Sequence, residues 1–399
     1  MSVRVAHVAT VDLTPRFLLL PQLVRLRDEG FDVAAITAPG PWTGDLESEG
    51  IRHIPWPHAT RSWAPRADLI AFRELVGIFR RERFHLVHTH TPKPGVLGRV
   101  AARLTGVPCV VNTVHGLYAT PEDRAARRLP VVAVERLAAR FSDLELFQSE
   151  EDLAWARRIR LVSTRRSLLL GNGVDLSRFD PAAISPDRLR ELRRALGIPA
   201  DAFVAGIVGR MVAEKGYREL FAAAETIRAS HPELRLLVIG GEDPEKADAL
   251  TREEVDRARE TTVFTGWRQD VPSLLALMDA FVLPSWREGL PRSAIEAAAM
   301  GKPLILTDIR GCREVARHGQ EGLLVPPRDP VRLAEAIETV MSDAALRQRM
   351  GAAARARAVE RFDERRVTET IVECYRSLLD RKGVSKTGAP VPVRPVTPR

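Results

Sequence analysis

Two glutamates, Glu288 and Glu296, stand eight residues apart in the stretch EGLPRSAIE, on either side of an expected helix start. Pro291 suits the first turn of a helix, so Glu288 precedes the helix and Glu296 lies on it. Eight helical residues span about 12 Å, which is the scale of a sugar joined to a nucleoside. Carboxylates accept hydrogen bonds from vicinal hydroxyl groups. The pair is therefore interpreted as holding two ends of one ligand, and the ordinary alternative is two solvated side chains.

Two cations, Arg210 and Lys215, follow the strand-like run FVAGIVG in the stretch VGRMVAEKG. A pair of cations beside a helix N-terminus suits a diphosphate, because the helix amides and the cationic heads converge on one anion. The backbone N–H groups around Gly289 and Leu290 are expected to donate to the same ligand. The alternative for the two cations is a pair of surface charges.

Three histidines lie at the ends of two strand-like runs, His88 and His90 in HTHTPKPG and His115 in NTVHG. A His-x-His pair with a remote histidine can bind zinc. No carboxylate or cysteine stands near them at ligand spacing, so no metal site is predicted. His88 and His90 are expected to be hydrogen-bonded in the core, and His115, followed by Gly116 at a strand tip, is the better candidate for the active site.

Strand-like apolar runs alternate with amphipathic helical stretches along the chain. The first set of strand-like runs is VRVAHVA, DVAAIT, FHLVHTH, PCVVNTV and DLELFQS, and a second set begins near Phe203 with FVAGIVG and LRLLVIGG. This alternation predicts parallel sheets with helices on both faces. The fold class is therefore α/β, with two doubly wound, Rossmann-like domains facing a cleft. Ligands in such sheets bind beyond the carboxyl ends of the strands.

The domain limits are drawn from changes in this pattern. Residues 1–180 form the first domain and residues 181–362 the second, joined by the Pro- and Asp-rich stretch DPAAISPD. A helix at residues 363–382 is expected to fold back onto the first domain. The Pro-rich residues 383–399 are expected to be disordered. Asn172 and Gly173 are interpreted as a plain interdomain turn, and the alternative is a loop that lines the cleft.

The composition excludes several classes of protein. Only three of the 399 residues are cysteines and none forms a CxxC pair, so no disulfide framework is expected and a cytoplasmic location fits. The first residues lack the apolar core of a signal peptide, and no stretch is apolar enough for a transmembrane helix. The net charge of +8 would suit nucleic acid, but aromatic residues are 6% and no RNA-binding motif occurs. GxGxxG and Walker A sequences are also missing.

Seven stretches together resemble the family-4 retaining glycosyltransferases of the GT-B fold, over residues 3–380. They are HTHTPKPGVLGRVAARLTGVP, TVHG, SEEDLAWA, GNGVDLSRF, VGRMVAEKG, VFTGWRQDV and PSWREGLPRSAIEAAAMGKPLILTDIRGCREV. The resemblance implies transfer of a hexose or N-acetylhexosamine from a nucleotide sugar, expected to be a UDP-sugar, without a metal or other cofactor. It also implies an acceptor-binding first domain and a donor-binding second domain.

The resemblance assigns roles to individual residues. Arg210 and Lys215 would neutralise the leaving diphosphate, and Glu296 would bind the ribose hydroxyls. Glu288 would face the donor sugar beside the backbone of Gly289, Leu290 and Pro291. His115 would touch the donor sugar near its anomeric carbon, and Trp267 and Arg268 would meet the edge of the base. His115, Arg210, Lys215 and Glu288 are thus the expected catalytic group.

The first strand–helix loop departs from the family pattern. Many members carry a Gly-Gly pair there, whereas this chain reads ATVDLTPRF, with Thr10, Asp12 and Thr14. These residues and Lys93 are the expected acceptor side. The stretches TPKPGVLGR, TVHG and RGCREV most resemble sequences of the branch that extends undecaprenyl-diphosphate-linked sugars of surface polysaccharides. That similarity implies a lipid-linked glycan acceptor.

Arginine-rich stretches at residues 61–84, 124–140 and 157–166 of the first domain fit an anionic membrane surface at the inner face. An ordinary solvated helix face is the alternative. Three other functions stay open for the same fold: transfer to a soluble small-molecule acceptor, nucleotide-sugar epimerisation, and glycoside phosphorolysis. The last would need a pyridoxal phosphate lysine, which the sequence does not reveal.

Overall fold

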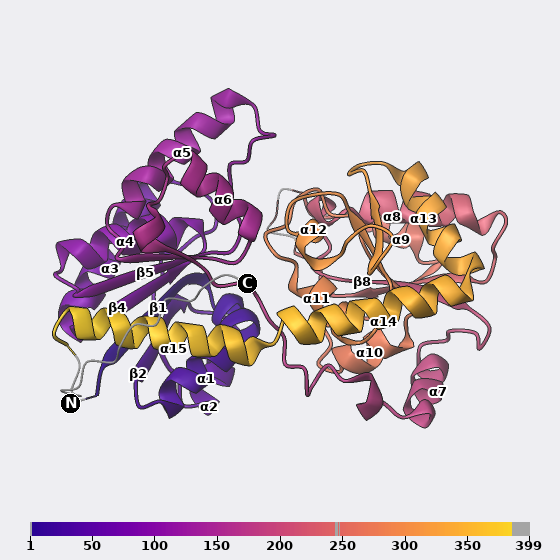
Figure 1. The fold of residues 1–399 in the computed structure, drawn as a ribbon, viewed down its shortest axis with the longest axis horizontal. Helices are drawn as coiled ribbons and strands as arrows, with labels where there is room; N and C mark the ends of the chain where they lie inside the picture. The colour runs from indigo at the N-terminus through magenta and orange to yellow at the C-terminus, as the bar shows by residue number, and fades with distance from the viewer. Residues whose placement is uncertain (1, 244–245, 247, 385–399) are drawn as a thin grey trace. The chain divides into compact units, whose positions relative to one another are not determined.

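The computed structural model describes residues 2–243, 246 and 248–384, and these residues form two compact units (Figure 1). The first unit comprises the chain up to Leu170 together with the residues from Arg366 onward, and the second is Gly171–Arg365. The domain boundary was predicted after residue 180, whereas the structure divides the chain after Leu170. The predicted disordered tail at residues 383–399 lies, from residue 385 onward, outside the described residues.

The first unit is built on a seven-stranded parallel sheet of order β3-β2-β1-β4-β5-β6-β7. Its central strands are nearly continuous apolar runs, as expected for strands that are covered on both faces. The strands are β1 (Arg4–Val11), β2 (Asp32–Ala38), β3 (Arg52–Pro55), β4 (Leu86–His90), β5 (Cys109–Val114), β6 (Leu144–Phe147) and β7 (Ser167–Leu169). The helices between them are a π-helical turn (Pro15–Leu19), α1 (Leu20–Asp28), α2 (Thr43–Ser48), α3 (Pro65–Glu82), α4 (Pro92–Leu104), α5 (Ala125–Ala139) and α6 (Glu150–Arg158).

The second unit is built on a six-stranded parallel sheet of order β10-β9-β8-β11-β12-β13. The strands are β8 (Phe203–Val208), β9 (Leu234–Ile239), β10 (Thr262–Phe264), β11 (Ala280–Leu283), β12 (Leu304–Thr307) and β13 (Gly322–Val325). The helices are α7 (Pro186–Ala195), α8 (Tyr217–Arg228), α9 (Arg252–Ala258), α10 (Val271–Leu277), α11 (Arg292–Ala299), α12 (Cys312–Val315), α13 (Pro330–Ser342) and α14 (Ala344–Arg361). Both predicted parallel sheets are confirmed.

The last described helix, α15 (Glu364–Arg381), belongs mainly to the first unit, although it follows the second in the chain (Figure 1). It buries Ile371, Val372, Tyr375, Leu378 and Leu379 in a core that also contains Val5, Leu86 and Leu146. Its apolar positions recur at helical spacing, which gives one face that can pack on the sheet. The predicted return of the C-terminal helix to the first domain is confirmed.

Candidate active site

The carboxyl ends of β8 and β11 bring Lys215 and Glu288 together. Lys215 ends a short 3₁₀ turn, Ala213–Lys215, that leads into α8. Its Nζ lies 2.6 Å from Oε1 of Glu288, and the Ser285 hydroxyl donates to the same oxygen at 2.7 Å. Gly216 follows with φ +79°, and a Cβ added there would lie 2.1 Å from the carbonyl oxygen of Pro284. Only glycine allows this approach of the two loops.

The loop between β11 and α11, residues 284–291, is fixed by contacts from three directions. The Thr307 hydroxyl at the end of β12 donates to the Ser285 carbonyl at 2.6 Å. The side-chain amide of Asn172 donates to the Leu290 carbonyl at 3.1 Å. Gly311 has φ +78°, and a Cβ added there would lie 1.9 Å from the Gly289 carbonyl oxygen. The backbone predicted to lie beside a donor sugar is therefore held by contacts from Thr307, Asn172 and Gly311.

Arg210 is paired with a carboxylate that the sequence analysis did not single out. Its Nη1 lies 2.6 Å from Oδ2 of Asp243, which is buried beyond the end of β9. A Cβ added at Gly240 would lie 2.0 Å from the Gly209 carbonyl oxygen, so these two strand ends are in close backbone contact. The pair orients the guanidinium, since a charged hydrogen bond of this length restricts a long side chain.

Trp267 and Arg268 follow β10 but have different surroundings. The Trp267 side chain is 49% exposed, and its Nε1 would lie 2.0 Å from a Cβ added at Gly241. The indole therefore covers the loop that leads to Asp243. Arg268 makes two hydrogen bonds of 2.8 Å to Asp270 at the start of α10. The Arg268 guanidinium is thus paired with the Asp270 carboxylate. Trp267 offers the more accessible surface for the predicted contact with a nucleotide base.

Glu296 lies on α11, one turn after Arg292, which bridges it to Glu364. Arg292 Nε is 3.3 Å from Glu296, and its Nη2 is 3.2 Å from Glu364. Burial raises the pKa of Glu296, although the positive charges of Arg292 and Arg178 oppose this shift. Glu288 lies in the loop before α11, as predicted, whereas Pro291 is the N-cap and not part of the first helical turn.

In the first unit, His115 lies directly after β5 and is partly exposed. Its Nε2 is 3.1 Å from Nδ1 of His90, and the Gln148 side chain also hydrogen-bonds the ring. Burial lowers the pKa of His115 to about 4, so the ring is neutral at physiological pH. His88 and His90 are fully buried and hydrogen-bonded, as predicted.

The acceptor-side loop is ordered by its own contacts. The Asp12 carboxylate accepts from the Trp42 backbone N–H at 2.7 Å. The hydroxyls of Thr10 and Thr91 are 3.2 Å apart, and Thr14 is buried. Thr91 has φ +65° and ψ 158°, a conformation otherwise nearly confined to glycine. Holding it costs about 1–3 kcal/mol, which the surrounding contacts must offset.

Lys93 is the fourth residue predicted for the acceptor side, and the structure places it in a buried ion pair. Its Nζ lies 2.5 Å from Asp68 and donates to the Thr60 hydroxyl at 2.8 Å and to the Ser62 carbonyl at 2.5 Å. The ammonium group also lies 5.5 Å from the centre of the Trp63 ring. Lys93 thus ties the segment before α3 to the start of α4.

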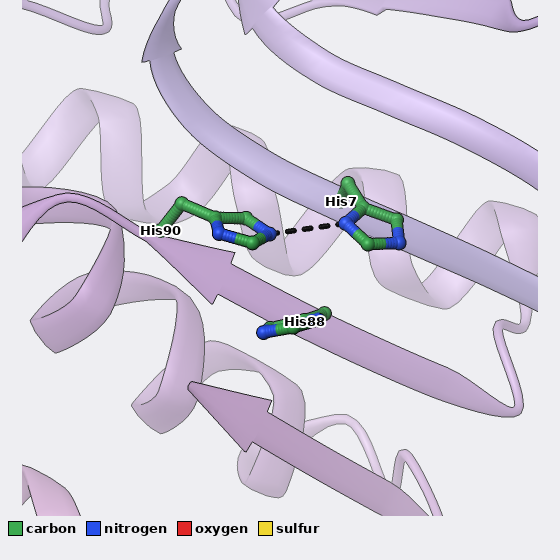
Figure 2. A group of neighbouring side chains, drawn as sticks. All are labelled: His7, His88 and His90. Carbon is green, nitrogen blue, oxygen red and sulfur yellow. Dashed lines mark hydrogen bonds between the residues drawn. The ribbon is translucent and has the colours of Figure 1, made fainter. Parts of the chain in front are cut away.

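Within the part of the chain that the structure describes, His7, His88 and His90 form the one group whose nitrogens could hold a metal ion (Figure 2). Their candidate ligand atoms lie within 4.8 Å of one another, and all three side chains are buried. His7 was missed by the sequence analysis, although it lies in the run VRVAHVA. Ser285 and Asp243 were also missed, although both follow strand ends as the predicted site residues do.

Comparison with known proteins decides the family. A "Glycosyl transferase 4-like domain" model matches residues 20–173, and a "Glycosyl transferases group 1" model matches residues 189–357. The chain is 31% identical over 351 residues to UDP-Gal:alpha-D-GlcNAc-diphosphoundecaprenol alpha-1,3-galactosyltransferase of Escherichia coli, covering 86% of this chain and 89% of that protein. The chain belongs to the family-4 glycosyltransferases. This glycosyltransferase is also 27% identical over 383 residues to the capsular polysaccharide biosynthesis glycosyltransferase CapM of Staphylococcus aureus, covering 94% and 97% of the two chains.

Solved structures show that the glycosyltransferase has the GT-B fold. Anabaena HepE in complex with UDP and glucose matches with a TM-score of 0.78 at 22% identity, over 94% of this chain and 100% of that chain. A glycosyltransferase of Rickettsia africae matches with a TM-score of 0.78 at 20% identity, over 95% and 99%. Because the curated relatives are glycosyltransferases, the comparisons do not favour an epimerase. Among the described residues of the enzyme, no helix combines the length and apolarity that crossing a bilayer requires.

Proposed function

We propose that the enzyme transfers a hexose or N-acetylhexosamine, with retention, from a UDP-sugar to a lipid-linked glycan at the cytoplasmic face of the membrane. The observation that carries the proposal is the Lys215–Glu288 pair of 2.6 Å at the carboxyl ends of two parallel strands. The E. coli relative is named for UDP-Gal and a diphosphoundecaprenol acceptor, which supports this donor and acceptor class. The HepE structure contains UDP and glucose, which supports the same donor.

The proposed chemistry centres on a diphosphate that must leave with its charge stabilised. Lys215 and Arg210 supply cations that are already oriented by Glu288 and Asp243, so little reorganisation is needed during the reaction. Oε1 of Glu288 accepts from both Lys215 and Ser285. Among the described residues, no group donates a hydrogen bond to Oε2 of Glu288, and we assign this oxygen to a hydroxyl of the donor sugar. His115 contributes a neutral ring near the anomeric carbon.

A donor panel tests the proposed function. Thermal unfolding is measured with UDP-, GDP- and ADP-sugars, because a ligand that binds only the folded state stabilises it by mass action. At a concentration one hundred times its Kd, the true donor should add about 2.7 kcal/mol to the free energy of unfolding. Stabilisation by a UDP-sugar and transfer to a diphosphate-linked lipid glycan are expected. Stabilisation by GDP- or ADP-sugars alone would contradict the proposed donor.

Metal removal is expected to leave activity unchanged. Arg210 and Lys215 provide the positive charge that a divalent cation provides in other transferases, so turnover should be retained in excess chelator. Initial rates are compared with and without EDTA after dialysis. Complete loss of activity that is restored by adding Mg²⁺ or Mn²⁺ would contradict this expectation.

Donor binding is expected to weaken at acidic pH because of Glu296. Its raised pKa means that it takes up a proton at a higher pH than an ordinary glutamate, and the neutral carboxyl group accepts weaker hydrogen bonds from hydroxyls than the carboxylate does. Glu296→Gln should weaken binding about tenfold to a hundredfold at neutral pH, the worth of hydrogen bonds to a charged group. Calorimetric titration of UDP across the acid range measures both effects.

The glutamine variant also provides the control for this prediction. A buried carboxylate with a raised pKa destabilises the folded state at neutral pH, so Glu296→Gln should keep or raise the thermal unfolding midpoint. The acid-induced loss of UDP affinity should become shallower in the variant. If the variant binds UDP like the wild type with the same pH dependence, Glu296 does not hold the ribose.

Helix α5 supports the proposed membrane contact. Leu129, Val134 and Leu137 are large apolar side chains that are exposed on it, Leu129 at 62%. Arginines stand at both ends and along the same helix, at positions 124, 127, 128, 136 and 140. A helix that exposes apolar side chains between cations suits the interface of an anionic bilayer. A lipid-linked acceptor would be presented at that interface.

Vesicle binding tests this contact. The protein should sediment with anionic vesicles at low salt and be released as salt rises, because the attraction is screened. Leu129→Asp combined with Leu137→Asp should abolish most of the binding. Val331→Asp, at a side chain 65% exposed on α13 of the other unit, is the matched control and should bind as the wild type does. Equal binding by the double variant would remove α5 from the proposal.

A further inference from the structure

A continuous chain of side-chain hydrogen bonds runs through the core of the first unit. It joins Thr113, His88, Tyr375, His7, His90 and His115 in that order, and we call it the histidine–tyrosine chain. The successive distances are 2.7 Å from Thr113 Oγ1 to His88 Nε2, 2.5 Å from His88 Nδ1 to Tyr375 Oη, 3.2 Å from Tyr375 Oη to His7 Nε2, 3.0 Å from His7 Nδ1 to His90 Nε2, and 3.1 Å from His90 Nδ1 to His115 Nε2.

Sheet register explains how residues so far apart in sequence meet. His7 of β1 is paired with His88 of β4, and His90 is paired with Thr113 of β5. Alternate residues of a strand point to the same face, so His88 and His90 share a face of the sheet (Figure 2). Helix α15 covers that face and brings Tyr375 to it.

The four rings are neutral, and this restricts how protons are arranged. Burial lowers the pKa of His7 to about 3 and moves the pKa of His88 and of His90 well below the usual value. A neutral imidazole has one donor and one acceptor nitrogen. Tyr375 could accept from both neighbouring rings, but its own buried proton would then lack an acceptor, because His88 and His7 are the hydrogen-bond partners of its hydroxyl. Tyr375 therefore accepts from one ring and donates to the other, and every link donates in the same direction along the chain. In one direction all four rings carry their proton on Nδ1, and in the other all four carry it on Nε2.

Thr113 selects the direction. Its side chain is buried, and within the described part of the molecule its hydroxyl hydrogen-bonds to His88 alone. If Thr113 donates, its proton is satisfied. If it accepts from His88, its own proton is buried without an acceptor, which is energetically unfavourable. The chain therefore runs from Thr113 to His115, with Nδ1–H on every ring.

A hydrogen-bonded chain accounts for the geometry better than a metal ion does. Two nitrogens of a tetrahedral zinc site, each about 2.0–2.1 Å from the ion, are about 3.3 Å apart. His7 Nδ1 and His90 Nε2 are closer, at 3.0 Å, and their rings are inclined by 14°. Each ring nitrogen of His7, His88 and His90 already has a hydrogen-bond partner.

We propose that the histidine–tyrosine chain locks His115 in the Nδ1–H form, which makes Tyr375 on the C-terminal helix a positioning residue for His115. His115 then presents a fixed donor beyond the end of β5, where Gln148 now contacts the ring. The effect on turnover rests on the proposed contact between His115 and the donor sugar. The tautomer of each ring does not depend on that contact.

Nuclear magnetic resonance of ¹⁵N-histidine-labelled full-length protein tests the proposal directly. Two-bond ¹H–¹⁵N spectra should show His7, His88, His90 and His115 as single Nδ1–H tautomers at neutral pH. Mixed tautomers, any of these rings in the Nε2–H form, or a stoichiometric metal by elemental analysis would overturn the proposal.

Tyr375→Phe should turn His7, His90 and His115 into tautomer mixtures and lower kcat about twofold to thirtyfold, with donor affinity unchanged. Tyr217→Phe removes another fully buried tyrosine hydroxyl, bonded to the Gly209 carbonyl of the second unit, and should leave the tautomers unchanged. If Tyr375→Phe does not fold, Thr113→Val breaks the start of the chain and should give the same mixture. A pure Nδ1–H His115 in the folded variant would overturn the lock, and mixed tautomers with unchanged kcat would overturn the positioning role.

Discussion

Replacing Lys215 by alanine is expected to lower kcat about a thousandfold while the protein stays folded. The ammonium group is the cation held at the strand ends beside the proposed diphosphate, and loss of one preorganised group that stabilises developing charge costs about a hundredfold to a thousandfold. Removing it also leaves Glu288 negative without its partner, which repels the diphosphate. Single-turnover transfer of radiolabelled sugar measures the rate.

Two further variants isolate the cause of this loss. Lys382→Ala removes a lysine that is paired with Asp143 at 3.2 Å in the first unit, and it should retain full activity. Glu288→Gln combined with Lys215→Ala should lose less than the sum of the two single effects, because residues that act as a unit are not additive. Near wild-type turnover in Lys215→Ala would remove this residue from the catalytic group.

Replacing Gly311 by alanine is expected to damage donor binding through the backbone alone. A methyl group there would lie 1.9 Å from the Gly289 carbonyl oxygen, so the loop that holds Glu288 must move. The residue also has φ +78°, where alanine is strained. We expect a loss of about 1–3 kcal/mol in the free energy of unfolding and at least about a tenfold loss of UDP-sugar affinity.

Gly301→Ala separates the clash from the strain. Gly301 has a similar φ of +67°, but the nearest atom to an added Cβ is 3.7 Å away. It should therefore lose stability by a similar strain and keep its donor affinity. Equal loss of affinity in both variants would show that the Gly311 effect is a general consequence of reduced stability.

The fold was predictable from the sequence because the central strands of both parallel sheets are buried on both faces. Runs such as VRVAHVA and FVAGIVG therefore read as strands without knowledge of their neighbours. The return of α15 to the first unit was predicted from a strong helical pattern in the sequence after the last predicted strand. The division at Leu170 was not predicted, because Gly171–Asp180 is joined to the second unit by contacts such as the Asn172 hydrogen bond to Leu290.

Strand-end positions were enough to select Arg210, Lys215 and Glu288, whose roles stay predictions. Their partners could not be read from the sequence, since pairing depends on which loops meet in space. Asp243 is 33 residues from Arg210 and reaches it because β8 and β9 are adjacent. Lys93 shows the same limit, because its ion-pair partner Asp68 lies on α3 and could not be identified from the sequence, and its contact with an acceptor stays a prediction.

The C-terminal position of α15 has a consequence for synthesis on the ribosome. Residues 366–379 complete the core of the first unit, yet the whole second unit is translated before they emerge. Domains generally fold during synthesis from the N-terminus onward. Here the apolar face formed by Val5, Leu86 and Val111 cannot be covered by α15 until that helix has been translated. Nascent chains paused before residue 366 should therefore carry an incomplete first unit that binds chaperones.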